Sequence, residues 1–98
     1  MAKIIYAPQA LEDFDRIIEH LLETSPDTAT VTLERIRNAI EILADHPMIG
    51  RRADEERREL VISRGTSGYL ALYRFDSAFG VVRVLRIRHQ REAGYRGA

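Results

Sequence analysis

The 98-residue sequence contains no cysteine, and this absence excludes disulfides, thiolate nucleophiles, iron–sulfur clusters and cysteine-based zinc sites. Long apolar runs are also missing, because no stretch approaches the roughly 20 residues that a membrane-spanning helix requires. The first residues do not combine such a run with a cleavage site, so we expect no signal peptide. Together these absences favour a cytoplasmic protein with no membrane partner.

Residue patterns of common active sites are absent too. The six glycines are scattered along the chain and do not form a phosphate-binding loop. The histidines at positions 20, 46 and 89 include no pair at the helical spacing that a metal site uses, and no base is positioned beside a serine or threonine nucleophile. We therefore expect no catalytic site, no metal, no cofactor and no small-molecule substrate.

Lysine is nearly absent, since Lys3 is the one lysine among 15 basic residues. The net charge is zero, but residues 1–50 hold four basic against nine acidic residues, whereas residues 51–98 hold eleven against six. An arginine-rich second half is suited to bind phosphates or carboxylates, because each planar guanidinium group offers five donors. Genomic base composition explains an arginine bias equally well, so the bias alone does not identify a ligand.

The chain does contain a regular succession of helix and strand patterns, in a length that suits a single domain, residues 1–98. A β-branched run at residues 3–6 predicts a strand, and Pro8 then opens a helix over residues 8–23. A second helix is predicted over residues 25–45, and the short linker requires an antiparallel hairpin. Three strands follow at residues 59–63, 69–76 and 81–88, with a turn at 64–68. The predicted fold is α+β: an N-terminal strand, an antiparallel helical hairpin and a three-stranded antiparallel meander.

Side-chain spacing predicts which faces are buried. On the first helix we expect an apolar stripe formed by Leu11, Phe14, Ile18, Leu21 and Leu22, and a solvent-facing acidic side formed by Glu12, Asp13, Asp15 and Glu19. If the last strand alternates strictly, Arg86 and Arg88 share one face, and Arg83 shares the other with Leu85 and Ile87. Leu85 is then expected in the core, and Arg86 and Tyr73 are expected to be mainly structural.

The last 16 residues form a basic cluster in which five arginines are opposed only by Glu92. Because little core can reach residues at or beyond the end of the last strand, we assign to target binding Arg88, His89, Arg91 and Arg96. Further candidates for the same surface are Arg51, Arg52, Arg74 and Arg86. Internal pairing with helix acids is an open alternative for the arginines. For His89, the alternatives are a general acid or base and a structural hydrogen-bond donor.

Four segments, in this order, resemble the RelE/ParE superfamily of bacterial type II toxins: YAP at residues 6–8, PMIGR at 47–51, GYLALYR at 68–74 and VLRIRHQRE at 84–92. The resemblance spans essentially the whole chain and implies the same fold. It also implies a partner, a small antitoxin whose flexible, acidic and hydrophobic C-terminal segment wraps the toxin and folds on binding. The apolar flank of the helical hairpin and the arginine-rich sheet edge both qualify as the receiving surface.

The superfamily contains two activities, and the resemblance implies a choice between them. RelE-like members cleave mRNA on the ribosome, typically with an arginine on the strand matching residues 69–76 and a histidine or tyrosine near the C-terminus. Here Leu70 stands at the arginine position and Gln90 at the tyrosine position. The sequence is more similar to the ParE branch, which poisons DNA gyrase without a nuclease site. Recurring ParE positions are matched by Arg86, His89 and Arg91, whereas Ala93 replaces a common aspartate.

We therefore predict a non-enzymatic toxin that inhibits DNA gyrase, alone or with its DNA, and that a cognate antitoxin holds inactive. One alternative is a RelE-type ribosome-dependent mRNA endoribonuclease. The other is a family member without toxicity that only binds its antitoxin and regulates its own operon. Leu70 and Gln90 are the residues that separate the first two hypotheses.

Overall fold

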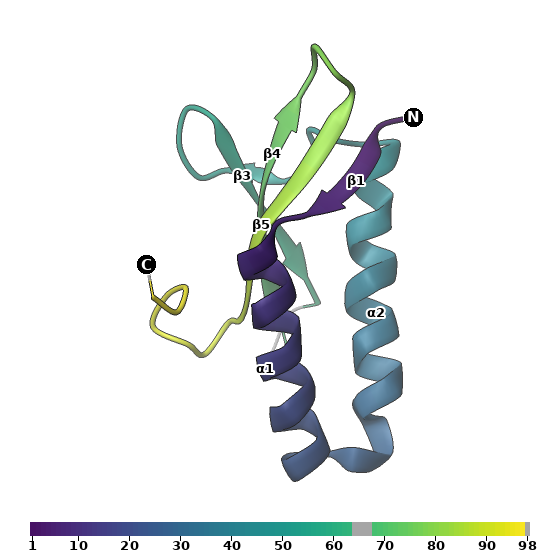
Figure 1. The fold of residues 1–98 in the computed structure, drawn as a ribbon, viewed down its shortest axis with the longest axis vertical. Helices are drawn as coiled ribbons and strands as arrows, with labels where there is room; N and C mark the ends of the chain where they lie inside the picture. Colours follow the sequence, from purple (N-terminus) through teal and green to yellow (C-terminus); the bar gives the residue numbers. More distant parts are fainter. Residues whose placement is uncertain (64–67, 98) are drawn as a thin grey trace.

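A five-stranded sheet organises the chain, in the order β1-β5-β4-β3-β2 (Figure 1). The computed structural model describes residues 1–63 and 68–97. The first strand, β1 (Lys3–Tyr6), runs parallel to the last, β5 (Val81–His89). The remaining neighbours are antiparallel, and they are β4 (Tyr69–Asp76), β3 (Arg57–Ile62) and the two-residue edge strand β2 (Arg51–Arg52). The predicted N-terminal strand and three-stranded meander are confirmed.

Strand boundaries differ slightly from the predicted ones. β3 begins two residues earlier and ends one residue earlier than expected, and β5 continues through His89. β2 was not predicted, because two arginines carry no strand pattern. The predicted turn at residues 64–68 lies, apart from Gly68, outside the described residues.

Two helices form the predicted antiparallel hairpin and lie side by side against one face of the sheet (Figure 1). α1 (Pro8–Thr24) begins at Pro8, whose missing N–H is not needed in a first helical turn. The second helix is shorter than predicted, because α2 (Ala29–Glu41) is flanked by the 3₁₀ turns η1 (Pro26–Thr28) and η2 (Ile42–Ala44). In the part of the chain that the structure describes, no helix is long and apolar enough to cross a membrane.

The orientation of α1 on the sheet differs from the one that its apolar spacing predicts. The buried residues of this helix are Ala10, Asp13, Ile17 and Leu21. Leu21 is buried as expected, but Leu11 and Leu22 keep 52% and 57% of their surface exposed. The prediction that Asp13 faces solvent was wrong, because Asp13 is only 3% exposed. A carboxylate within the buried row obscured that row in the sequence.

A β-bulge interrupts the alternation of β5. The pairing of β5 with β4 shifts by one residue opposite Leu85, which is left without a partner on β4. Residues beyond the bulge therefore change face, and Ile87 joins Val84 in the buried core, whereas Leu85 is only half-buried. The prediction that Leu85 and Ile87 share a face was wrong, because an extra residue breaks the period of two.

Tyr73, in the middle of β4, is fully buried and structural, as expected. Its hydroxyl donates to the Pro47 carbonyl and accepts the Gly50 N–H, both at 2.8 Å. Arg58 Nη1 donates to the Gly50 carbonyl, also at 2.8 Å. A Cβ at position 50 would lie 2.6 Å from the Tyr73 ring, so this close approach requires glycine. The loop after η2 is thereby held firmly on the sheet.

Candidate functional site

The buried carboxylate of Asp13 joins α1 to the edge of β5. β1 pairs with β5 only as far as Val84, and beyond that point Asp13 Oδ2 accepts the Ile87 N–H at 2.8 Å, as a neighbouring strand would. Arg86 donates to both Asp13 oxygens, from Nε at 2.9 Å and from Nη2 at 3.2 Å. The hydrogen bond with Asp13 raises the pKa of the Arg86 guanidinium. Arg86 is thus engaged inside the molecule, as the internal-pairing alternative requires.

The C-terminal segment, residues 90–97, folds back over the sheet. The Tyr95 hydroxyl donates to Glu59 Oε2 on β3 at 2.6 Å. The guanidinium carbons of Arg86 and Arg88 lie 5.7 and 5.2 Å from the centroid of the Tyr95 ring, within the range of a cation–π contact. Arg88 Nη1 also donates to the Glu92 carbonyl at 2.7 Å. These contacts fasten the segment at several points.

The hydroxyl of Tyr95 and the carboxylate of Glu59 are electrostatically coupled. Burial and the hydrogen bond to Glu59 raise the pKa of Tyr95 well above its usual range. Burial by itself would raise the pKa of Glu59, but hydrogen bonds from Tyr95 and Arg51 lower it below its ordinary value. Glu59 therefore stays ionised, and the Tyr95 hydroxyl remains a donor.

The burial of Arg88 is greater than we expected for a residue beyond the reach of the core. It is half-buried and is held by Tyr95 and by the Glu92 carbonyl. Its assignment to target binding stays a prediction, and any substitution of it will also loosen the C-terminal segment.

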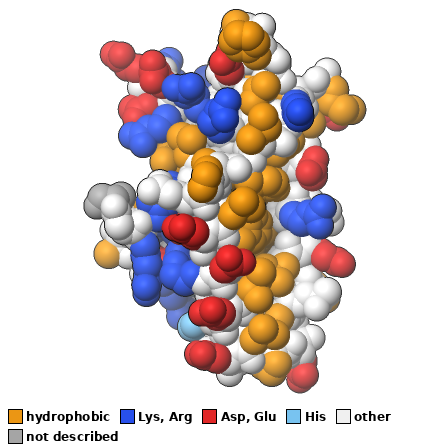
Figure 2. Space-filling model, in the orientation of Figure 1, with side chains coloured by type: hydrophobic (Ala, Val, Ile, Leu, Met, Phe, Trp, Pro, Cys, Tyr) orange, Lys and Arg blue, Asp and Glu red, His pale blue; other side chains and the backbone are white. Residues whose placement is uncertain are grey.

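Three of the expected target-binding residues line one cavity of about 400 Å³, and they are His89, Arg91 and Arg96. The rest of the lining comes from α1, from the start of β4 and from the C-terminal segment, as Arg16, Ile17, His20, Tyr69 and Glu92. Figure 2 shows arginine side chains and a histidine gathered on this flank, beside α1. Sequence reasoning missed Arg16 and Tyr69, because only the packing of α1 against β5 brings them near the C-terminal residues. The spacing of Arg16 and His20, one helical turn apart, was the available signal.

Hydrogen bonds order the side chains of this cavity. Glu92 Oε1 pairs with Arg16 Nη1 at 2.6 Å, and Glu92 Oε2 accepts the His89 N–H at 2.7 Å. The His89 ring stands edge-on to Tyr69, with centroids 5.1 Å apart. His89 Nδ1 accepts the Arg91 N–H at 3.1 Å, which places the proton of the neutral ring on Nε2. The cavity is therefore a cationic and well-supported site, and among the described residues no cluster suits a metal ion.

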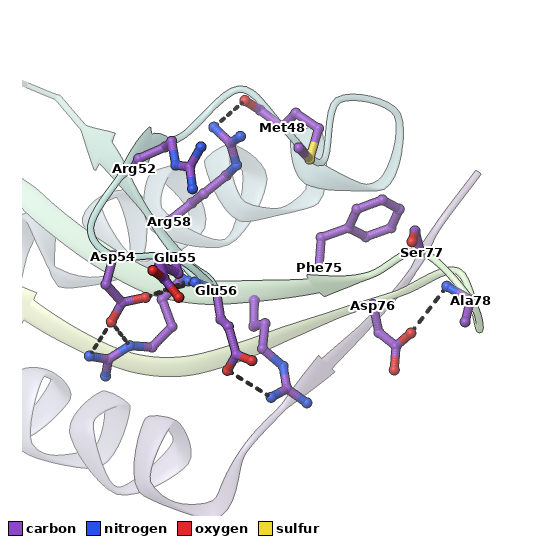
Figure 3. Close-up of a pocket in the computed structure, with 12 residues that line it drawn as sticks. Met48, Arg52, Asp54, Glu55, Glu56, Arg58, Phe75, Asp76, Ser77 and Ala78 are labelled. Atoms are coloured by element: carbon purple, nitrogen blue, oxygen red, sulfur yellow. Dashed lines mark hydrogen bonds and ion pairs between the residues drawn. The ribbon is translucent and has the colours of Figure 1, made fainter.

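Arg52 and Arg74 lie elsewhere, in a second hollow of about 420 Å³ between the segment after β2 and the turn after β4 (Figure 3). Carboxylates are interspersed with its arginines, and Arg74 Nη1 approaches Glu56 Oε2 at 3.8 Å. Arg51 lines neither hollow and pairs with Glu59 at 2.5 Å. The structure therefore places Arg52 and Arg74 away from the C-terminal cluster, whereas Arg51 shares Glu59 with Tyr95 of the C-terminal segment.

Structural side chains occupy the two positions that separate the gyrase and ribonuclease hypotheses. Leu70 is 6% exposed and pairs with Arg88 in the sheet. The Gln90 N–H donates to the Gly68 carbonyl at 3.0 Å, and a side chain at position 68 would collide with the Gln90 amide. Neither residue can supply a cation or transfer a proton.

Known proteins are similar to this chain over nearly its whole length. Residues 4–94 match the family described as the ParE toxin of the type II toxin–antitoxin system parDE. The chain is 34% identical over 92 residues to toxin RelE3 of Caulobacter vibrioides, covering 94% of this chain and 98% of the relative. It is also 34% identical over 89 residues to toxin RelE2 of the same organism, covering 91% and 96%.

Solved structures share the fold. A chain of the chromosomal ParDE system from P. aeruginosa superposes with a TM-score of 0.75 at 22% identity, covering 91% of this chain and 96% of that one. A chain of the intact E. coli RelBE toxin–antitoxin complex superposes with a TM-score of 0.64 at 15% identity, covering 94% and 100%. The strand, helical hairpin and meander of this chain are thus those of ParE and RelE toxins.

Proposed function

Since the chain belongs to the ParE toxin family of type II toxin–antitoxin systems, we propose that it inhibits DNA gyrase in the cytoplasm by binding, without enzymatic activity. The observation that carries this proposal is that positions 70 and 90 hold leucine and glutamine. A ribonuclease must stabilise a pentacoordinate phosphate and move the proton of a 2′-hydroxyl. Leu70 is buried, and Gln90 packs against Gly68, so neither can take part in such a reaction.

Two arginines of β5 are also engaged. Arg86 is paired with Asp13, and Arg88 is bonded to the C-terminal segment. Contacts with the target then fall to Arg91 and Arg96, whose side chains are exposed, together with His89 at the end of β5. On this proposal the residues around the cavity bind the target, and the arginines of the sheet stabilise the fold.

Two assays, run side by side on the purified chain, test the proposal. We expect it to block supercoiling by gyrase and to leave ribosome-bound message intact. Replacing Arg91 and Arg96 together by alanine should restore supercoiling with a change in stability of no more than about 0.5 kcal/mol each, the usual size for exposed positions. Arg83→Ala is the matched control, because Arg83 is also an exposed arginine and lies on β5. Cleavage of the message with normal supercoiling would overturn the proposal.

The ribonuclease hypothesis is the second candidate, and one observation favours it. His20, His89 and Tyr69 line the same cavity as three arginines, and histidine and tyrosine are groups that act in general acid–base catalysis. The message-cleavage arm decides between the two. In the non-toxic hypothesis neither assay responds, and cells that express the chain alone grow normally.

We also infer where the antitoxin binds. The solved neighbours include toxin–antitoxin complexes, and Figure 2 shows a hydrophobic band along the helical hairpin, with acidic side chains beside it on α1. The exposed or half-buried apolar residues of α1 are Leu11, Phe14, Ile18 and Leu22. Such an uncovered band is typical of a protein interface. The hydrophobic part of the antitoxin segment fits this band, and its acidic part fits the arginines of the sheet.

Co-purification tests this surface. Leu22→Asp should weaken the complex with the antitoxin, because it introduces a charge into the band at an exposed position. Phe79→Asp is the matched control, since Phe79 is 80% exposed but lies in the turn after β4. If Leu22→Asp binds the antitoxin as tightly as Phe79→Asp, the antitoxin uses another surface.

A further inference from the structure

The cavity lined by His89, Arg91 and Arg96 gathers cationic and titratable side chains from segments that are far apart in the sequence. α1 contributes Arg16 and His20, and the C-terminal segment contributes two arginines. Its volume of about 400 Å³ lies within the range of pockets that hold small ligands. Three arginines and two histidines around one space point to an anionic ligand.

Two arginines of the cavity have guanidinium N–H donors that no nearby carboxylate of the described residues fully engages. Among the described lining residues the one carboxylate is that of Glu92, and it is already engaged by Arg16 and by the His89 N–H. In the described part of the chain no side chain pairs with Arg91, and Arg96 is 72% exposed with a 3.8 Å approach to Glu92. Three arginines against one engaged glutamate give the described lining of the site a net positive charge even with both histidines neutral.

The second hollow shows that such an excess is not general on this surface. Its lining alternates arginines with carboxylates, namely Arg52, Arg57, Arg58 and Arg74 with Asp54, Glu55, Glu56 and Asp76 (Figure 3). Two cavities of similar size therefore differ in charge, and only the one beside α1 is cationic.

We propose that the cavity beside α1 binds a phosphate group, the backbone phosphate of the nucleic acid that accompanies the target. A phosphate has more acceptor oxygens than a carboxylate, and it suits guanidinium groups that approach from several sides. The Tyr69 ring and Ile17 supply an apolar wall for the attached sugar. The identity of the nucleic acid rests on the proposed function. The group that His89, Arg91 and Arg96 recognise is the phosphate.

NMR titration of the purified chain tests it with two probes, inorganic phosphate and a short double-stranded DNA. Both should shift the resonances of His20 and His89, and phosphate should compete with the DNA. Arg91→Ala should weaken phosphate binding about tenfold or more, the loss expected for one charge-assisted hydrogen bond. Arg83→Ala should leave it unchanged.

The outcomes separate the two proposals. Phosphate binding without DNA binding would support the phosphate site and identify a free phosphorylated molecule as its source. The phosphate site would be overturned if neither phosphate nor DNA binds, or if Arg91→Ala binds phosphate as tightly as Arg83→Ala does. Gyrase inhibition measured on the same samples reports on the proposed function independently, because a chain that inhibits gyrase without binding phosphate refutes only this inference.

Discussion

Removal of the Asp13 carboxylate should be among the most damaging single changes in this chain. Asp13→Ala leaves Arg86, whose side chain is 11% exposed, as a buried cation without its counter-ion, and it leaves the Ile87 N–H without an acceptor. Breaking a buried ion pair from one side costs about 3–5 kcal/mol, and an unsatisfied buried N–H costs about 1–3 kcal/mol. The two penalties overlap, so we expect a loss of about 3–5 kcal/mol.

Urea denaturation followed by circular dichroism measures this loss directly. Asp15→Ala is the matched control, because Asp15 lies two residues away on the exposed side of α1 and should change stability by no more than about 0.5 kcal/mol. In a domain of this size each kcal/mol shifts Tm by roughly 4–8 °C, so thermal melting should separate the two variants clearly.

A double substitution examines the cause of the loss. Replacing Asp13 by leucine and Arg86 by methionine removes both charges, and it should recover part of the stability that Asp13→Leu alone loses. Equal stability of Asp13→Ala and Asp15→Ala, or a double variant no more stable than Asp13→Leu, would refute the reasoning that a buried ion pair anchors α1.

Three further predictions concern the sheet. Tyr73→Phe should cost about 1–3 kcal/mol in urea denaturation, because it removes both hydrogen bonds to the loop after η2. Ile87→Ala should cost about 2–5 kcal/mol and Leu85→Ala clearly less, since only Ile87 is fully buried; equal losses would contradict the bulge. The pKa of Glu59 is lower in the folded chain than its ordinary value. The ionised Glu59 therefore adds to the free energy of unfolding at a pH above that ordinary pKa, and this contribution is lost as the pH falls through the pKa of the folded chain. Glu59→Gln should accordingly make stability fall less steeply with decreasing pH.

The order of elements was readable from the sequence because it depends on local chemistry. Pro8 opens α1, and β4 begins and ends at the predicted residues, because its alternation is unbroken and separates Tyr69 and Tyr73 in the core from Leu70 on the other face. The four family segments were also local patterns, and they led to the family that the comparisons show. Where a side chain's environment is set by its neighbours in the chain, spacing is enough.

Tertiary packing decided the rest. The burial of Asp13 depends on β1 ending before β5 does, which leaves the Ile87 N–H to donate to Asp13 on α1. The bulge at Leu85 depends on the register with another strand. The cationic cavity exists because α1 places Arg16 beside a C-terminal segment that Tyr95 fastens to Glu59. Contacts of this kind join residues far apart in the chain, and their energies are settled only when the elements pack together.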